Sequence, residues 1–379
     1  MRTFPANAIM SLVEGTAPRY ELGESVGPDC RLADLFDGAA EERVADLPLA
    51  YGTAEGDPRL RAAIAEANGV SPGDVVVTMG GSHALFLLAF ILCDAGDEAV
   101  ITSPVFPLAR NALDVVGATV RALPLHFERG YRLDAATLGA QLSARTKLVS
   151  LASPQNPSGV ATDLDTLGAI LAAMHHTCPD AYLLVDETYR EAAYGDDPVA
   201  PSAVTLGPKV VTISSLSKCH GAPGLRLGWA ITQDRLLREH LVRGKFSTVI
   251  SCSPLCEALA LQVFDRRESI GAARRAHLAE GRAGTAAWVD ENSGLVEWVR
   301  PDAGALCCVR LRSSVFDDAA VTRVYEALAG EGVRVADGRW FGEEARVFRL
   351  GFGLLSIADL RQALNAFTAV LQYVAHEVA

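Results

Sequence analysis

The sequence predicts an α/β protein with a mostly parallel seven-stranded sheet sandwiched by helices, and a smaller α+β domain. Two observations support this fold class. From about residue 75 onward, short apolar runs alternate with helix-length segments, and strands that are almost entirely apolar are typical of a parallel sheet covered on both faces. Beyond about Pro254 the alternation becomes less strict, which favours a second domain of the α+β type.

Seven runs are expected to form the large sheet: residues 75–79, 98–103, 119–125, 147–152, 182–186, 209–214 and 227–231. Helix-length segments such as Asp134–Ala144 and Asp163–His176 lie between them, and Thr162 is a suitable N-cap for the second. The apolar run 84–93 is half as long as a membrane span, so it predicts a buried helix. In such a sheet, ligands bind in the loops at the carboxyl ends of the strands.

The rest of the chain predicts one long helical stretch at 254–291, a helix at 317–331 and a closing helix at 356–376. Strands are expected at 295–299, 305–311, 333–336 and 346–352. The sequence contains neither a fixed-period repeat nor a Ser/Pro-rich linker. We therefore expect two domains joined by a continuous helical connection.

The composition is that of a globular protein, because half of the 379 residues are apolar and 21% are charged. The formal charge is −12 and no block of Lys and Arg is present, which argues against a nucleic-acid-binding surface. The eight cysteines have no CxxC spacing, so we expect reduced thiols and no metal site. The first residues lack the pattern of a signal peptide, and we expect a cytoplasmic protein that does not enter membranes.

The segment 214–228 carries the strongest chemical signal. It reads Ser-Ser-Leu-Ser-Lys-Cys-His-Gly-Ala-Pro-Gly-Leu-Arg-Leu-Gly, with Lys218 soon after a predicted strand and Arg226 eight residues later. A lysine amine can form a Schiff base with an aldehyde cofactor if its neighbours lower its pKa. Serine and arginine side chains at fixed offsets, such as Ser215 and Arg226, can bind a phosphate. An ordinary loop lysine would explain Ser-x-x-Lys alone, but not the full string.

Further polar groups follow other predicted strands. Residues 80–82, Gly-Gly-Ser, open the apolar helix, where backbone N–H groups can bind an anion, although such a turn is common. Asn156, in Ser-Pro-Gln-Asn-Pro-Ser-Gly, can donate to a phenolate oxygen, and Asn-Pro is also a common turn. Asp186 ends an apolar strand, where its carboxylate needs a partner such as a protonated pyridine nitrogen; a helix cap is the alternative.

Two more positions complete the pattern. Phe106, in Ser-Pro-Val-Phe-Pro after the strand at 98–103, can stack on a cationic ring, although a phenylalanine beside proline is usually part of the core. Arg349 lies at the centre of an apolar strand, where a guanidinium requires an anionic partner such as a carboxylate. Arg346 is the competing candidate for this role.

In this order and over nearly the whole chain, these segments resemble the class I/II aminotransferases of fold type I, which use pyridoxal 5′-phosphate (PLP). The resemblance implies that Lys218 holds PLP as an aldimine, that Asp186 keeps the ring nitrogen protonated and that Tyr189 contacts the ring oxygen O3′. It implies further cofactor contacts from Gly81, Ser82, Phe106, Asn156, Ser215 and Arg226. On the substrate side it implies Arg349, Ser25 and Asn156.

Tyr51, in Leu-Ala-Tyr-Gly-Thr-Ala-Glu-Gly, resembles the tyrosine that reaches the cofactor phosphate of the neighbouring subunit. The resemblance therefore implies a homodimer with shared active sites. It also implies an N-terminal segment at 1–45 on the substrate side, a large PLP-binding domain at 46–265 and a small domain at 266–379. This chain has His83 where the family often has Gln, Glu or Thr, and Ser25 where a Gly-Glu-Pro pattern is usual. The Ser25 departure concerns substrate specificity most, and the two departures together leave the type of reaction open.

The activity that the resemblance implies is transfer of an amino group between an L-amino acid and a 2-keto acid. A PLP-dependent lyase or cyclase acting on a modified amino acid, such as a hydroxylated guanidino amino acid, is an alternative, because the same residues serve several reactions after the Cα proton is removed. A second alternative is the PLP-binding, non-catalytic half of a transcription regulator. Such regulators carry a basic DNA-binding extension, which the length and charge of this chain do not favour.

Overall fold

The computed structural model describes residues 3–14, 16–36 and 38–378. Its largest sheet has the strand order β2-β8-β7-β6-β5-β3-β4. The strands are β2 (Val75–Thr78), β3 (Glu98–Ser103), β4 (Thr119–Pro124), β5 (Thr146–Ala152), β6 (Tyr182–Asp186), β7 (Val210–Ser215) and β8 (Gly228–Thr232). Neighbouring strands are parallel except at β8, which is antiparallel to both β2 and β7. This confirms the predicted sheet, with each strand boundary within one residue of the expected position.

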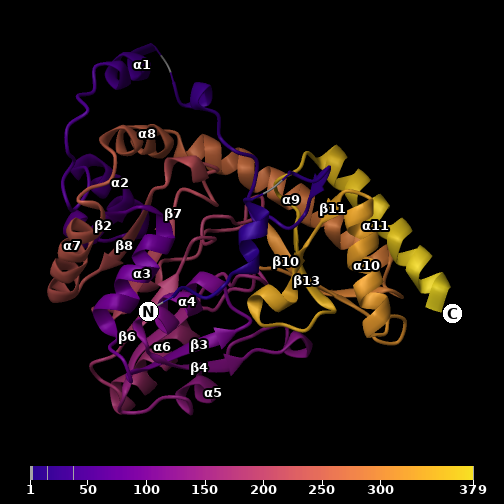
Figure 1. Ribbon diagram of the computed structural model, residues 1–379. Coiled ribbons are helices and arrows are strands. Elements are labelled where there is room, and N and C mark those ends of the chain that lie inside the picture. Colours follow the sequence, from indigo (N-terminus) through magenta and orange to yellow (C-terminus); the bar gives the residue numbers. More distant parts are fainter. Residues whose placement is uncertain (1–2, 15, 37, 379) are drawn as a thin grey trace.

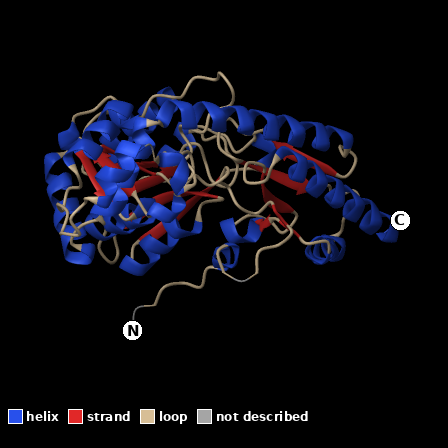
Figure 2. Ribbon diagram, turned by 90° about the horizontal axis from the view of Figure 1, so that it is seen from above, coloured by secondary structure: helices blue, strands red, loops and turns tan. Residues whose placement is uncertain are grey.

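Helices cover both faces of this sheet (Figures 1 and 2). Because side chains alternate along a strand, Leu148 of β5 packs on one face with α3 (Gly80–Leu92), α4 (Pro107–Val116) and α7 (Arg235–Val249). Its neighbour Val149 packs on the opposite face with α5 (Ala135–Gly139) and α6 (Leu164–Thr177). Near the edge, Val75 of β2 contacts the layer formed by α2 (Pro58–Asn68) and α8 (Pro254–Asp265). The short helix α1 (Gly38–Ala45) lies beside α8.

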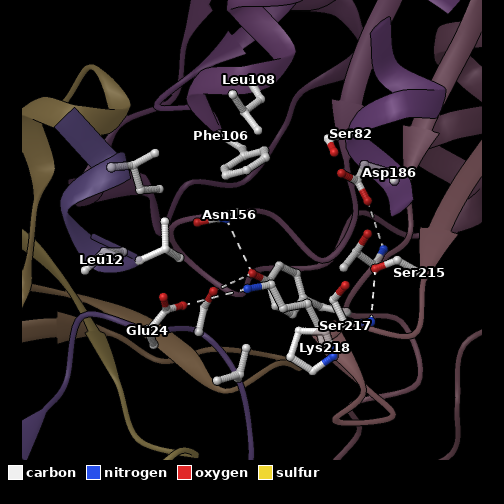
Figure 3. Close-up of a pocket in the computed structure, with 18 of the residues that line it drawn as sticks. Leu12, Glu24, Ser82, Phe106, Leu108, Asn156, Asp186, Ser215, Ser217 and Lys218 are labelled. Atoms are coloured by element: carbon white, nitrogen blue, oxygen red, sulfur yellow. Dashed lines mark hydrogen bonds and ion pairs between the residues drawn. The ribbon is translucent and has the colours of Figure 1, made fainter. Parts of the chain in front are cut away.

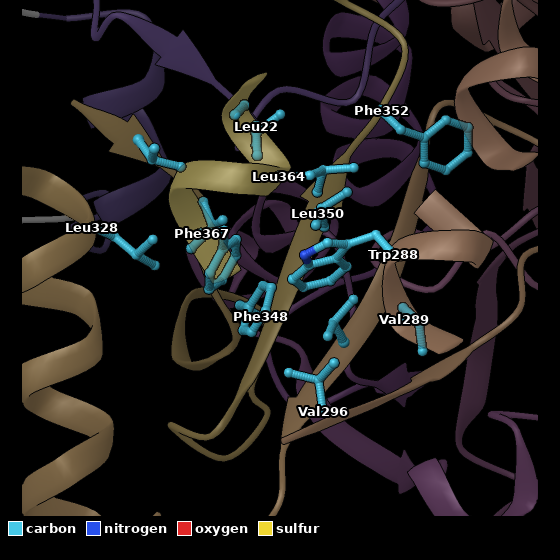
Figure 4. Close-up of a cluster of buried hydrophobic side chains, with 14 of the residues drawn as sticks. Leu22, Trp288, Val289, Val296, Leu328, Phe348, Leu350, Phe352, Leu364 and Phe367 are labelled. Carbon is cyan, nitrogen blue, oxygen red and sulfur yellow. The ribbon is translucent and has the colours of Figure 1, made fainter. Parts of the chain in front are cut away.

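The C-terminal part forms a four-stranded antiparallel sheet in the order β12-β13-β10-β9. Its strands are β9 (Val296–Val299), β10 (Leu306–Leu311), β12 (Ala336–Asp337) and β13 (Val347–Gly351). The helices α9 (Arg267–Glu291), α10 (Asp318–Gly330) and α11 (Ile357–Val378) enclose an apolar core with it around Trp288, Phe348 and Phe367 (Figure 4). The N-terminal strand β1 (Tyr20–Glu21) pairs in parallel with β11 (Val333–Arg334), so the beginning of the chain joins this part of the fold.

Four expected elements differ in detail. The helical stretch expected at 254–291 is divided at Arg266, whose φ of −110° separates α8 from α9. The strand expected at 333–336 becomes two strands, because β11 pairs with β1 whereas β12 pairs with β13. The N-cap of α6 is Asp163 rather than Thr162, because the Asp163 carboxylate accepts a hydrogen bond from the N–H of Thr166. The helix expected at 134–144 is shortened to α5.

We propose that the domain boundaries follow the expected division into 1–45, 46–265 and 266–379. Two features support it: α9 begins at Arg267, and β1 adds the N-terminal segment to the C-terminal part through β11. Among the described residues, no helix combines the length and apolar character needed to cross a membrane.

Candidate active site

One cavity of about 690 Å³ lies where the large sheet meets the C-terminal sheet and the N-terminal segment (Figure 3). The loops that follow β3, β5, β6 and β7 line it, as expected for the carboxyl ends of parallel strands. The cavity brings together every predicted site residue except Tyr51: Ser25, Gly81, Ser82, Phe106, Asn156, Asp186, Tyr189, Ser215, Lys218, Arg226 and Arg349.

Lys218 lies in the loop that follows β7. Its Nζ is 3.9 Å from Oε2 of Glu24. Burial is the main cause that lowers the pKa of the Lys218 amine to about 8; Glu24 opposes this effect, while Arg349 and Arg226 add to it. About a tenth of the amine is therefore unprotonated at pH 7, far more than for an ordinary lysine, and the unprotonated form is the one that a nucleophile or a general base requires.

An anion site lies at the beginning of α3. No side chain caps this helix at Met79, so its first N–H groups are open to an anion. Arg226 adopts a left-handed conformation with φ of 49°, and its guanidinium lies so close to Gly80 that a Cβ there would be 2.9 Å from Nη2. Ser215 lies beside the same turn, because a Cβ at Gly81 would be 4.0 Å from the Cβ of Ser215. Backbone dipoles, a guanidinium and a hydroxyl thus converge on one end of the cavity.

Asp186 ends β6 with its carboxylate in the cavity, where Oδ1 accepts a hydrogen bond of 3.0 Å from the N–H of Thr188. Burial raises the pKa of this carboxyl, and the bond to Thr188 and the charge of Lys218 oppose that shift. A carboxylate in such surroundings requires a cationic partner to stay ionised. The adjacent Glu187 instead forms a buried ion pair with Arg190, 3.1 Å away, and belongs to the framework.

A short chain of hydrogen bonds crosses the middle of the cavity. The Tyr189 hydroxyl lies 2.7 Å from Oγ of Ser25, and Nδ2 of Asn156 donates to Tyr189 Oη over 3.4 Å. Burial raises the pKa of Tyr189 to about 12, so its hydroxyl remains a hydrogen-bond donor across the physiological range. Asn156 and Tyr189 therefore present their donors to the same region.

Arg349 of β13 is only 2% exposed and faces the same cavity. Nη1 donates to Oδ1 of Asn156 over 2.8 Å and Nη2 to the carbonyl of Gly23 over 2.5 Å, while Nε has no hydrogen-bond partner among the described residues. Both acceptors are neutral, so the guanidinium retains a positive charge that suits a carboxylate ligand. The competing candidate, Arg346, turns away and binds Asp318 at 2.7 Å.

Two residues singled out in the sequence lie elsewhere. Tyr51 is 83% exposed and does not line the cavity of its own chain. His83 accepts a hydrogen bond from the N–H of Met79 at Nδ1, and its Nε2 lies 3.0 Å from Oγ1 of Thr248, so it links the start of α3 to α7.

Several lining residues were not predicted. Glu24, Thr188 and Ser217 contribute polar groups, and an apolar wall comes from the N-terminal 3₁₀ helix and its neighbours: Ile9, Met10, Leu12 and Val13. Glu24 could have been found, because it is an acidic residue directly beside the predicted Ser25. The apolar wall carried no signal, because a few apolar residues near a terminus form no periodic pattern.

The family model for aminotransferase class I and II matches residues 42–367. Capreomycidine synthase from Streptomyces vinaceus is 33% identical over 303 residues, which cover 79% of this chain and 76% of that protein. Arginine–pyruvate transaminase AruH from Pseudomonas aeruginosa is 29% identical over 334 residues, covering 83% and 80%.

Solved structures show the same fold over almost the entire chain. A PLP-dependent aminotransferase from Streptococcus suis superimposes with a TM-score of 0.89 at 22% identity, covering 98% of both chains. The PLP-dependent cyclase OrfR gives a TM-score of 0.86 at 24% identity, again over 98% of both chains.

Proposed function

Because the chain belongs to the aminotransferase class I and II family, we propose that it transfers the amino group of an L-amino acid to a 2-keto acid. Membership of this family makes the protein a PLP-dependent enzyme. The observation that carries the proposal is that Lys218 and Arg349 line one cavity. A reactive amine and a buried guanidinium together match the two groups that every amino acid substrate must present, its Cα–N centre and its α-carboxylate.

The donor set of the cavity fits PLP. The uncapped start of α3 with Ser82, Ser215 and Arg226 would hold the phosphate. Phe106 would pack on the ring, and Asn156 and Tyr189 would donate hydrogen bonds to O3′. Asp186 would pair with the protonated ring nitrogen, which supplies the cation that the buried Asp186 carboxylate needs. When bound through Lys218, PLP supplies an electron sink that stabilises the carbanion left when Cα loses its proton.

The chain's own side chains would orient the substrate and move the proton. Arg349, held by Asn156 and the carbonyl of Gly23, would bind the α-carboxylate and fix the Cα–H bond relative to the ring. Ser25 would lie beside it through its contact with Tyr189. Lys218, with its amine pKa lowered to about 8, would take the proton from Cα and return it during the transfer.

The second candidate reaction is cyclisation or elimination on a modified amino acid. The similarity to capreomycidine synthase favours it, because that relative covers most of this chain. Both reactions need the same removal of the Cα proton, so the residues above serve either one. The two reactions differ only in the steps after that proton has left.

A product assay on the PLP-loaded enzyme separates these reactions. Each amino acid of a donor panel is incubated with and without a 2-keto acid acceptor. Formation of the donor's keto acid only when the acceptor is present supports transamination. Keto acid and ammonia without an acceptor would instead identify a lyase, and a cyclic amino acid product would identify a cyclase.

A homodimer is supported by exposed large apolar side chains, which include Leu49, Tyr51, Phe246 and Ile250. The loop that carries Tyr51 lies against the segment after α7, because a Cβ at Gly52 would be 3.4 Å from the carbonyl oxygen of Cys252. Exposed apolar surface of this kind is typical of subunit interfaces. In a twofold assembly Tyr51 would complete the phosphate site of the second subunit. The cytoplasmic location expected from the sequence stays a prediction.

A further inference from the structure

We propose that Glu24 is a positioning residue for Lys218, and that its carboxylate stabilises the ammonium group that forms when the Lys218 amine takes the proton from Cα. The inference rests on the proposed function, because it deepens the proton transfer that is assigned to Lys218. It depends on the geometry of the two side chains, on the charges around the amine, and on the way in which the backbone holds the two residues.

Glu24 and Lys218 both point into the cavity (Figure 3). Oε2 of Glu24 lies 3.9 Å from Nζ of Lys218, and the two side chains are 20% and 26% exposed. The Glu24 carboxylate forms no hydrogen bond with the residues that the structure describes, and its ionic contact there is with Lys218. The carboxylate is therefore directed at the amine that performs the proposed proton transfer.

The charges around the amine act in opposite directions. Burial is the largest cause that lowers the pKa of Lys218 to about 8, and the guanidinium groups of Arg349 and Arg226 add to this effect. Two carboxylates oppose it, Glu24 more strongly than Asp186. An amine that is buried beside two cations accepts a proton at a high cost in free energy, and Glu24 is the main group that reduces this cost.

In the loaded cavity the other charges would have partners of their own. Arg226 would pair with the phosphate, Arg349 with the α-carboxylate of the substrate, and Asp186 with the protonated ring nitrogen. The cation that then remains is the ammonium group of Lys218, and Glu24 is the carboxylate beside it. Because a buried charge is costly without a counter-ion, Glu24 lowers the free energy of the state in which Lys218 carries the proton.

The backbone fixes the Glu24 side of this pair. The carbonyl of the preceding residue, Gly23, accepts a hydrogen bond from Nη2 of Arg349. A Cβ at Gly351 of β13 would overlap the carbonyl oxygen of Glu24, so the segment packs tightly against that strand. The position of Glu24 therefore follows from the same strand that carries Arg349.

The Lys218 loop is tied to the same N-terminal segment. Arg274 of α9 donates from Nη2 to the carbonyl of Lys218 over 3.1 Å and from Nη1 to the carbonyl of Pro28. A Cβ at Gly221 would lie 2.7 Å from that carbonyl oxygen of Pro28, so the loop and the segment are in close contact. Glu24 and Lys218 are thus held near each other by their backbones, and a charge positioned in advance stabilises a developing charge without rearrangement.

The first test uses the cofactor-free protein, so its result does not depend on turnover. Stopped-flow absorbance gives the rate of PLP uptake against pH for the unchanged protein and two variants. Because Glu24 raises the pKa of Lys218, we expect the midpoint of the Glu24→Gln profile to move about one pH unit toward acid. Asp29→Asn is the matched control. The Asp29 carboxylate is exposed and acts on Cys30 and Arg274, so we expect a shift of less than about 0.2 unit.

The second test asks whether the PLP-loaded enzyme uses this stabilisation. We expect Glu24→Gln to lower kcat at least about tenfold while KM for the amino donor changes less than about threefold, because Glu24 acts on the proton rather than on the substrate carboxylate. Deuterium at Cα of the donor is expected to slow Glu24→Gln more than it slows the unchanged enzyme, since removal of this proton becomes the slower step.

An unshifted midpoint in Glu24→Gln, or an equal shift in Asp29→Asn, would overturn the pairing of Glu24 with Lys218. A shifted midpoint with unchanged kcat and an unchanged isotope effect would overturn the role in proton transfer. A shifted midpoint in a protein that transaminates no amino acid would refute the proposed function and leave the pairing intact; transamination with an unshifted midpoint would do the reverse.

Discussion

At the scale of single residues, the Lys218 amine is controlled by its surroundings. Burial and the neighbouring guanidinium groups of Arg349 and Arg226 lower its pKa to about 8. Below that value, the unprotonated fraction rises about tenfold per pH unit. We expect the rate at which the cofactor-free protein takes up PLP to increase steeply from pH 6.5 to 8 and to level off by about pH 9. Stopped-flow absorbance measures this rate, and a profile without a rise over this range would contradict the assigned pKa.

Arg349 allows a second prediction, with a control on the same strand segment. Arg349→Lys keeps the charge but loses the two-pronged geometry that suits a carboxylate. We expect kcat/KM for the amino donor to fall about 30- to 100-fold, equivalent to about 2–3 kcal/mol. Arg346→Lys changes a side chain that binds Asp318 outside the cavity, so we expect less than about a threefold effect. Similar losses in both variants would show that the strand, and not the Arg349 contact, determines activity.

Most site residues could be predicted because each chemical role requires a particular residue type directly after a strand. Lys218, Asp186 and Asn156 were found in this way. Glu24 also lines the cavity and was missed, although it lies directly beside the predicted Ser25. The sequence favoured Arg349 over Arg346, and Arg349 lines the cavity whereas Arg346 binds Asp318 outside it.

At the scale of elements, the start of β8 packs against the first turn of α3. This contact determines the shape of the end of the cavity where we propose that the PLP phosphate binds. A Cβ at Gly228 would lie 2.6 Å from the backbone of Gly80 and Gly81. We expect Gly228→Ala to displace this turn, to weaken PLP binding at least about tenfold and to reduce the free energy of unfolding by about 1–3 kcal/mol. Gly224→Ala is the matched control, because nothing lies within 4 Å of a Cβ there.

Fluorescence titration with PLP and thermal unfolding of the two variants give these quantities. A Gly228→Ala variant with unchanged PLP affinity would mean that the turn tolerates displacement and does not form the anion site. A comparable loss of PLP affinity in Gly224→Ala would mean that the effect comes from the loop as a whole and not from the contact at Gly228.

The strands of the large sheet were predictable to within one residue, because a buried parallel strand is an uninterrupted apolar run. The divided elements were not. The separation of β11 from β12 depends on two different pairing partners: β1, which lies far away in the sequence, and β13, which follows soon after β12. The break at Arg266 likewise leaves no proline or glycine that would mark it.

At the scale of the whole molecule, the position of Tyr51 makes the number of subunits testable. Tyr51 lies outside the cavity of its own chain. If it completes the site of a partner, a mixed dimer of Lys218→Ala and Tyr51→Ala chains contains one fully intact site. We expect each variant alone to be impaired at limiting PLP, and a co-refolded equal mixture to recover about a quarter of the unmutated activity, as random pairing predicts.

Light scattering during size-exclusion chromatography measures the mass of the same samples. A monomer by this measurement would contradict the shared site. If the protein is a dimer but the co-refolded mixture shows only the average activity of the two variants, Tyr51 does not act across the interface.

The central claim, transfer of an amino group through Lys218, is tested most directly by following isotopically labelled nitrogen from an amino donor. We expect the PLP-loaded enzyme to move the label into the amino acid formed from an added 2-keto acid, and only when that acceptor is present. We also expect at least about a thousandfold slower transfer by Lys218→Ala, with loss of the long-wavelength absorbance of the lysine-bound cofactor. Release of the label as ammonia without an acceptor, or normal absorbance and transfer in Lys218→Ala, would contradict this claim.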